Sequence, residues 1–98
     1  MASFIATLSF TPQGVASCQD TCKRAAAFKA AAKKLGGKVT GTYWTLGAFD
    51  GVLIFEAPDD ETATTMMLHL GSLGFVKTQT ARAFTAAEME QILAAKSS

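Results

Sequence analysis

The chain has 98 residues, of which 49% are hydrophobic and 17% are charged, and its formal net charge is +1. This length allows one domain with a modest core, and the near-neutral charge gives no strong field for nucleic acid or an acidic membrane surface. No apolar run approaches the roughly 20 residues that span a bilayer. The N-terminus lacks the basic and unbroken apolar regions of a secretory signal, so we expect a cytoplasmic protein.

The first third of the chain predicts a strand followed by a helix. Residues 3–10 alternate between two faces, which is typical of a strand, and the turn residues 11–14 end it. Residues 20–35 carry apolar side chains at helical spacing, and Gly36-Gly37 ends this helix. The side predicted to be buried consists of Cys22, Ala25, Phe28, Ala32 and Leu35.

The middle of the chain predicts a β-hairpin with strands at 38–46 and 49–57. Gly47-Ala48 is read as a two-residue type II′ loop, because its first central position needs a positive φ. Leu46 then pairs with Phe49, and Thr45 pairs with Asp50. This register places Trp44, Leu46, Phe49, Leu53 and Phe55 on one face, and Tyr43, Thr45, Asp50, Val52 and Ile54 on the other.

The last part predicts a helix, a strand and a short final helix. Pro58 stops the third strand, and Asp59 is a good N-cap for a helix that Gly71 and Gly74 close. Residues 75–84 alternate as a fourth strand, and Thr85 with Glu88 forms a capping box for the final helix. We expect two apolar sides to face inward: Ala63, Met66, Met67, Leu70 and Leu73 in the first helix, and Met89, Ile92 and Leu93 in the second.

This β-α-β-β-α-β order with a C-terminal helix predicts a single α+β domain over 1–98, with the ferredoxin-like fold. Its sheet has four antiparallel strands, the first and third of them central, and both helices cover one face. The third strand is apolar on both faces, with Val52 and Ile54 on one and Leu53 and Phe55 on the other. A strand that is apolar on both faces is usually buried on both faces, so we predict that a second subunit covers the helix-free face.

Several segments of the sequence resemble the GYD-domain family. They are Tyr43-Trp44-Thr45-Leu46-Gly47-Ala48-Phe49-Asp50, Glu56-Ala57-Pro58-Asp59-Asp60, Gly71-Ser72-Leu73-Gly74 and Thr80-Ala81-Arg82-Ala83-Phe84-Thr85, with Phe10-Thr11-Pro12-Gln13-Gly14 and Lys23-Arg24-Ala25. In place of Gly-Tyr-Asp the chain has Gly47, Phe49 and Asp50 with Ala48 inserted, so the phenolic hydroxyl is missing. The family resembles the dimeric α/β-barrel group, in which two open sheet faces enclose a cavity. That group includes cofactor-free monooxygenases, isomerases and haem enzymes, but the resemblance implies no particular activity.

The mixed face of the predicted sheet is the candidate binding surface. The richer apolar face of the hairpin is assigned to the helices, so the other face meets the partner subunit. An apolar floor with a few convergent polar groups is typical of ligand pockets. The predicted lining is Ile5, Thr7, Ser9, Tyr43, Thr45, Val52, Ile54, Thr78, Thr80 and Arg82, and the candidate catalytic residues are Asp50, Arg82 and Tyr43.

Each candidate also has a structural interpretation. Asp50 could act as a general base, cap backbone donors or pair with Arg82. Arg82 could hold a carboxylate or an enolate, or make an ion pair or a dimer contact. Tyr43 could donate a proton or a hydrogen bond, or it could be an interface tyrosine. Trp44 is predicted to be core, and His69 to be exposed on its helix.

The two cysteines predict neither a disulfide framework nor a metal site. Cys18 and Cys22 stand four residues apart, with no further cysteine in the chain. A closed zinc site needs about four ligands, so we expect no metal and no cofactor. A redox role would need a perturbed thiolate; otherwise Cys22 is a buried small residue and Cys18 starts the helix.

Three function classes follow from these residues. The first is a homo-oligomeric module that binds a small, partly apolar organic molecule in the cavity between the sheets. The second is a cofactor-independent enzyme, isomerase-like or monooxygenase-like, with Asp50 as base and with Arg82 and Tyr43 stabilising negative charge. The third is a regulatory or structural oligomer without a ligand. The expected partners are a second copy of the chain and a small ligand, but neither nucleic acid nor a membrane.

Overall fold

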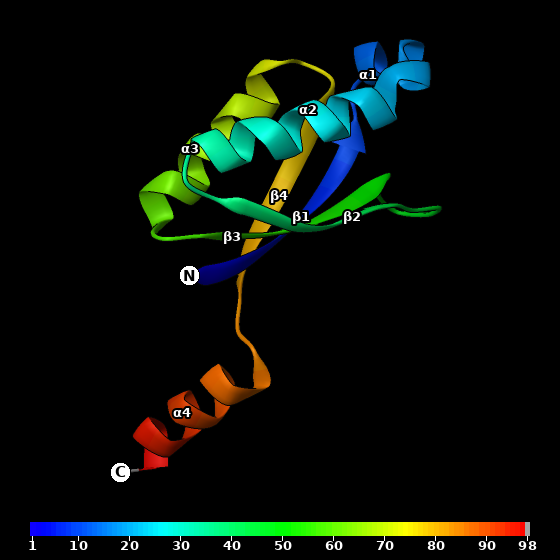
Figure 1. Cartoon of the computed structure of the whole chain (residues 1–98). Helices are drawn as coiled ribbons and strands as arrows, with labels where there is room; N and C mark the ends of the chain where they lie inside the picture. Colours follow the sequence, from blue (N-terminus) through cyan, green and yellow to red (C-terminus); the bar gives the residue numbers. More distant parts are fainter. Residues whose placement is uncertain (98) are drawn as a thin grey trace.

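Four antiparallel strands form one sheet in the order β2-β3-β1-β4 (Figure 1). The computed structural model describes residues 1–97. The strands are β1 (Ala2–Phe10), β2 (Lys38–Trp44), β3 (Gly51–Ala57) and β4 (Val76–Ala83). The central places of β1 and β3 confirm the predicted ferredoxin-like α+β topology.

Two long helices lie on one face of this sheet. They are α2 (Thr21–Lys34) and α3 (Asp60–Ser72), and α2 is preceded by the short helices α1 (Pro12–Ala16) and η1 (Cys18–Asp20). The last helix, α4 (Ala86–Ser97), lies on the other side of the sheet from α2 and α3 and stands apart from it (Figure 1).

The core fills the space between the sheet and these two helices. The rings of Phe4 and Phe55 stack at a centroid distance of 5.2 Å, and Phe55 and Met66 are fully buried. The centre of the side predicted to be buried is therefore right for both α2 and α3. The ends of these sides are wrong, because Cys22 is exposed in the first turn of α2, and Leu35 and Leu73 are exposed just after the last residues of α2 and α3. The other buried hydrophobic residues of the core are Phe4, Ala6, Phe28, Ala32, Val39, Leu53, Ala57 and Ala63.

The helix-start signals in the sequence are confirmed. The carboxylate of Asp59 accepts a hydrogen bond from the Thr62 N–H at 2.7 Å, which caps α3. One start signal was missed, because a turn was predicted at 11–14. There the Thr11 hydroxyl caps α1 by accepting from the Gly14 N–H at 3.0 Å, and Pro12 occupies the first turn, where its missing N–H costs nothing.

The predicted two-residue hairpin loop is wrong. The ladder of β2 and β3 ends at the pair Trp44–Gly51, and a single bond from the Thr45 N–H to the Asp50 carbonyl, at 2.9 Å, closes the turn. The loop therefore runs over 46–49, and the Thr45 hydroxyl spans it by donating to the Phe49 carbonyl. As a result Leu46 is fully exposed rather than part of the core.

The final helix also differs from the prediction. Its apolar residues Met89, Ile92 and Leu93 are 43%, 41% and 50% exposed, and α4 has no buried residue. The radius of gyration of the described chain is 14.8 Å, against about 12.5 Å for a compact chain of this length. The apolar side of α4 therefore lacks a partner within residues 1–97.

A substitution at Gly47 tests the geometry of the loop. The φ of Gly47 is +144°, and a Cβ placed there meets nothing within 4 Å, so a side chain would cause backbone strain without a steric clash. Gly47→Val should lower the free energy of unfolding by about 1–3 kcal/mol through backbone strain alone. Gly71→Ala is the matched control, since Gly71 is helical and equally open. That change should be neutral or stabilise by up to about 1 kcal/mol. Urea unfolding decides it, and equal midpoints for Gly47→Val and the unmodified chain would show that the strain is absent.

Candidate functional site

The strand register decides which residues share the helix-free face. Residues directly opposite each other in an antiparallel pair lie on the same face. Ile5 lies opposite Ile54, and both Thr7 and Tyr43 lie opposite Val52. Since Phe4, Ala6, Leu53 and Phe55 are buried under the helices, this set faces away from them. The prediction for the centre of that face is confirmed.

These residues form a continuous apolar patch across β1, β3 and β2, which we call the sheet patch: Ile5, Thr7, Tyr43, Val52 and Ile54. Ile5 is 40% exposed and Tyr43 is 60% exposed. The Tyr43 ring and the Ile54 side chain lie over Gly41, where a Cβ would stand 3.2 Å from the tyrosine ring. The patch is therefore a packed surface with a single aromatic ring at its β2 end.

The prediction is wrong for β4, where three of the proposed site residues lie on the helix side. Arg82 lies opposite Phe4, Thr80 opposite Ala6, and Thr78 opposite Leu8. Alternation within β4 is correctly predicted, but only the pairing with β1 decides which set faces the helices. The helix-free face of β4 carries Lys77, Gln79, Ala81 and Ala83 instead.

Thr78, Thr80 and Arg82 line a groove of about 640 Å³ between β4 and α3. The Arg82 guanidinium lies 4.5 Å from the Phe84 ring centroid and 5.6 Å from that of Phe4. It also donates to the Ser3 carbonyl at 3.2 Å. The cation is thus held against aromatic rings and the start of β1, away from the sheet patch.

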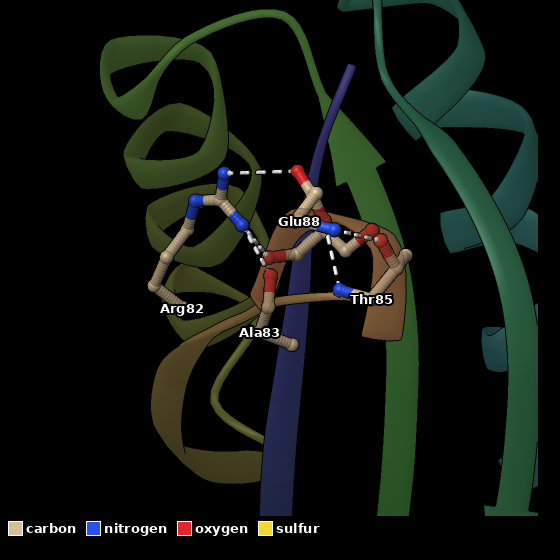
Figure 2. Close-up of polar contacts among 5 residues, drawn as sticks. Arg82, Ala83, Thr85 and Glu88 are labelled. Carbon is tan, nitrogen blue, oxygen red and sulfur yellow. Dashed lines mark hydrogen bonds and ion pairs between the residues drawn. The ribbon is translucent and has the colours of Figure 1, made fainter. Parts of the chain in front are cut away.

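Arg82 also holds the start of α4 (Figure 2). Its guanidinium donates to the Ala83 carbonyl and lies 3.8 Å from the Glu88 carboxylate. Glu88 and Thr85 form the predicted capping box, in which the Glu88 carboxylate accepts from the Thr85 N–H at 2.8 Å. This bond lowers the pKa of Glu88. The structural interpretation of Arg82 as an ion-pair partner is correct, but its partner is Glu88 rather than Asp50.

Asp50 caps a backbone donor, as one of its structural interpretations predicts. Its carboxylate accepts the Phe10 N–H at 2.7 Å, and its own N–H donates to the Leu8 carbonyl at 2.8 Å. It lines a pocket on the helix side of the sheet, with Leu8, Phe10 and Leu53. The expectation that Asp50 and Arg82 both face the cavity between two sheets is therefore wrong.

The remaining candidates are spread over the surface. Ser9 lies opposite Lys77 on the helix-free face, and Thr45 closes the hairpin turn. Trp44 is half exposed rather than core, and its ring N–H donates to the Thr21 hydroxyl at 3.0 Å. His69 is exposed, as predicted. Both cysteines are free and exposed, so the expectation that Cys22 is buried is wrong.

Two further observations describe residues 1–97 as a whole. No group of three histidine, cysteine, aspartate or glutamate side chains in this range could hold a metal ion together. No helix in the same range is long and apolar enough to cross a membrane.

Sequence reasoning misses two features of the surface. It assigns the apolar side of α4 to the core, although the short link of Phe84 and Thr85 after β4 leaves little chain for a return to the sheet. It also leaves Arg24 out of the predicted buried side of its helix, yet the guanidinium lies 4.2 Å from the Phe75 ring centroid. No pattern in the sequence places those two residues together.

Comparisons with known proteins agree with this architecture. A family model described as the GYD domain matches residues 4–93. A Thermus thermophilus protein described as "Glutamine synthetase and cystathionine beta-lyase binding protein" is 40% identical over 57 residues, which is 58% of this chain. The match spans 60% of that relative's length. The crystal structure of TTHA0845, also from Thermus thermophilus, has a TM-score of 0.57, with 23% identity, over 88% of this chain and 96% of that one. This last likeness concerns the fold.

The capping role of Asp50 predicts a loss of stability that is independent of any ligand. Asp50→Ala leaves the Phe10 N–H without its acceptor and should lower the free energy of unfolding by about 1–3 kcal/mol. Asp20→Ala is the control, because Asp20 is exposed and makes no capping bond, and it should change stability by less than about 0.5 kcal/mol. Thermal and urea melts measure both changes. An Asp50→Ala protein as stable as the control would contradict the assigned role.

Proposed function

The chain belongs to the GYD domain family, and from this premise we propose that it is a homo-oligomeric binding module assembled through the helix-free face of its sheet. The observation that carries the proposal is the sheet patch. Helices α2 and α3 cover one face of the sheet, and in a single chain the other face presents Ile5, Tyr43, Val52 and Ile54 to solvent. Exposed contiguous apolar patches of this kind mark interaction sites.

A second copy of the chain is the simplest partner for this patch. The patch is apolar in its middle and has Ser9, Lys77 and Gln79 on the same face of the sheet beside it, so it can meet an identical surface across a two-fold axis. An isologous contact would bring Ile5 and Ile54 of one copy near those of the other. The two sheets would then form a closed layer, with the helices outside.

The position of α4 supports the same assembly. It lies on the helix-free side of the sheet, and its apolar side of Met89, Ile92 and Leu93 is exposed (Figure 1). Arg82 and the capping box fix the start of this helix, so its direction is set by the chain itself. A second copy that covers the sheet patch would also lie within reach of α4, and one interface would bury both apolar surfaces.

We propose, further, that the assembled module binds other proteins. This extends to the present chain what the name of the Thermus relative says of that protein, which is 40% identical over the aligned residues. With the sheet patches turned toward each other, the outer surface of α2 and α3 remains available to a partner. The roles of Asp50 and Arg82 agree with a binding module. Asp50 caps the Phe10 N–H, and Arg82 bonds to the Ser3 carbonyl and to Glu88 at the start of α4.

A small, partly apolar organic molecule between the two sheets is the second candidate. Ile5, Thr7, Ser9, Tyr43, Val52 and Ile54 would line such a cavity, and their hydroxyls would provide its polar contacts. The cofactor-independent enzyme interpretation has less support, because Arg82, Thr78 and Thr80 lie on the helix side and Asp50 caps the Phe10 N–H.

The self-assembly is tested by solution mass. Light scattering at micromolar concentration should give twice the chain mass of 10.3 kDa or a higher multiple. Ile54→Lys should reduce the mass to that of one chain, because it buries an unpaired charge in the interface. Val15→Lys is the matched control, since Val15 is exposed on α1, outside the sheet patch, and its mass should not change.

A second variant tests whether the apolar side of α4 takes part in the self-association. Ile92→Glu should weaken self-association at least about tenfold, which corresponds to about 1.4 kcal/mol. Glu90→Gln, on the same helix, should leave it unchanged. A monomeric mass for the unmodified chain, or an unchanged mass for Ile54→Lys, would contradict the assembly.

Protein binding is tested with the two enzymes that the relative's name contains. The chain, immobilised on a sensor surface, should bind purified glutamine synthetase or purified cystathionine beta-lyase saturably, but should not bind an unrelated enzyme of similar size. The same measurement on Ile54→Lys shows whether binding needs the assembled module. Absence of saturable binding to both enzymes would contradict the extension from the relative to this chain.

A further inference from the structure

A second cavity lies on the opposite side of the sheet from the sheet patch. It is a pocket of about 80 Å³ under the first half of α2, between the ends of β1 and β2 and the starts of β3 and β4. Its walls are mainly apolar and include Leu8, Phe10, Leu53, Phe75 and Val76. The pocket lies on the helix side of the sheet and shares only Tyr43 with the sheet patch of the interface proposed above.

The wall of this apolar pocket contains one cation among the described residues. Arg24 lines the wall, and its guanidinium lies 4.2 Å from the Phe75 ring centroid. One terminal nitrogen, Nη1, donates to the Ser17 carbonyl at 2.8 Å. The other, Nη2, is buried and has no hydrogen-bond partner among the described residues. A buried guanidinium nitrogen without an acceptor is costly, so this nitrogen has a strong tendency to bind an anionic oxygen.

The charged residues in the wall restrict the charge of a ligand, and the volume of the pocket restricts its size. Asp50 also lines the pocket, and one of its carboxylate oxygens accepts the Phe10 N–H. No ion pair joins Asp50 to Arg24 in residues 1–97. Within residues 1–97, Arg24 is the one cation that lines the pocket, so it can offset a single carboxylate. A second negative charge on the ligand would find no further cation among these lining residues and would add to the repulsion from Asp50. An apolar cavity of about 150 Å³ holds benzene, so a pocket of 80 Å³ suits a body of a few carbon atoms.

We propose that this pocket binds a small organic monocarboxylate. The carboxylate accepts from Nη2 of Arg24, and the short apolar body lies against Leu8, Leu53 and Val76. The bond from the Trp44 ring N–H to the Thr21 hydroxyl, at 3.0 Å, holds two further wall residues of the pocket in place. The proposed contacts with the ligand come from residues outside the sheet patch, so they do not depend on the proposed self-assembly.

Sodium butyrate is the probe, and n-butanol and succinate are its matched controls. Amide and arginine side-chain NMR signals of the labelled full chain are followed during titration. We expect saturable shifts at Leu8, Ala25 and Val76 and at the Arg24 Nε–H, with butyrate bound at least about tenfold more tightly than n-butanol, which lacks the charge. Succinate should bind more weakly than butyrate because of Asp50.

Two variants on α2 separate the site from non-specific attraction. Arg24→Met keeps the aliphatic stem but removes the cation, and it should weaken butyrate binding at least about tenfold. Lys23→Met removes an exposed cation from the neighbouring position and should leave binding unchanged within about twofold. The shift of the Arg24 Nε–H in the unmodified chain keeps the test decisive even where Arg24→Met fails to fold.

Three results would overturn the proposal. They are the absence of saturable shifts in the pocket, equal binding of butyrate and n-butanol, and butyrate binding that Arg24→Met leaves unchanged. The oligomeric mass, measured on the same sample, shows separately whether the proposed function stands.

Discussion

The structure depends on one imbalance: four strands present two faces, and two helices cover only one of them. Strand β3 makes this clear, because its residues alternate between buried Leu53 and Phe55 and half-buried Val52 and Ile54. The first pair packs against Phe4 and the helices, which gives the chain its core. The second pair has no cover within the chain. Burial of this second face is what a partner can offer, and the proposed assembly follows from it.

The charged residues that first suggested chemistry turn out to hold the ends of the sheet. Asp50 attaches the hairpin to the end of β1 through the Phe10 N–H, and Arg82 attaches the start of α4 to the start of β1 through the Ser3 carbonyl. Each satisfies a backbone group that the strands leave unpaired. Their positions at opposite ends of β1 also explain why no ion pair forms between them.

Local patterns in the sequence were sufficient for the four strands, for the two long helices and for the centre of the core. Period-two alternation gave the strands, and the side chains of Asp59 and Thr85 marked the starts of α3 and α4 correctly. Alternation alone could not tell which side of β4 faces the helices, because that depends on pairing Arg82 with Phe4 rather than with a neighbour one residue away. The position of α4 could not be predicted either, since an apolar helix side packs equally well on its own chain or on another. The unpartnered nitrogen of Arg24 depends on tertiary packing that no local pattern records.

Closure of the helix-free face on a second copy of the chain is tested most directly by an isotope-filtered NMR experiment. Equal amounts of labelled and unlabelled chain are mixed, and nuclear Overhauser effects are recorded only between the two kinds of chain. We expect intermolecular effects from the methyl groups of Ile5, Val52 and Ile54, including contacts to the Tyr43 ring. A sample with oligomeric mass in which these methyl groups show no intermolecular effect would contradict this closure.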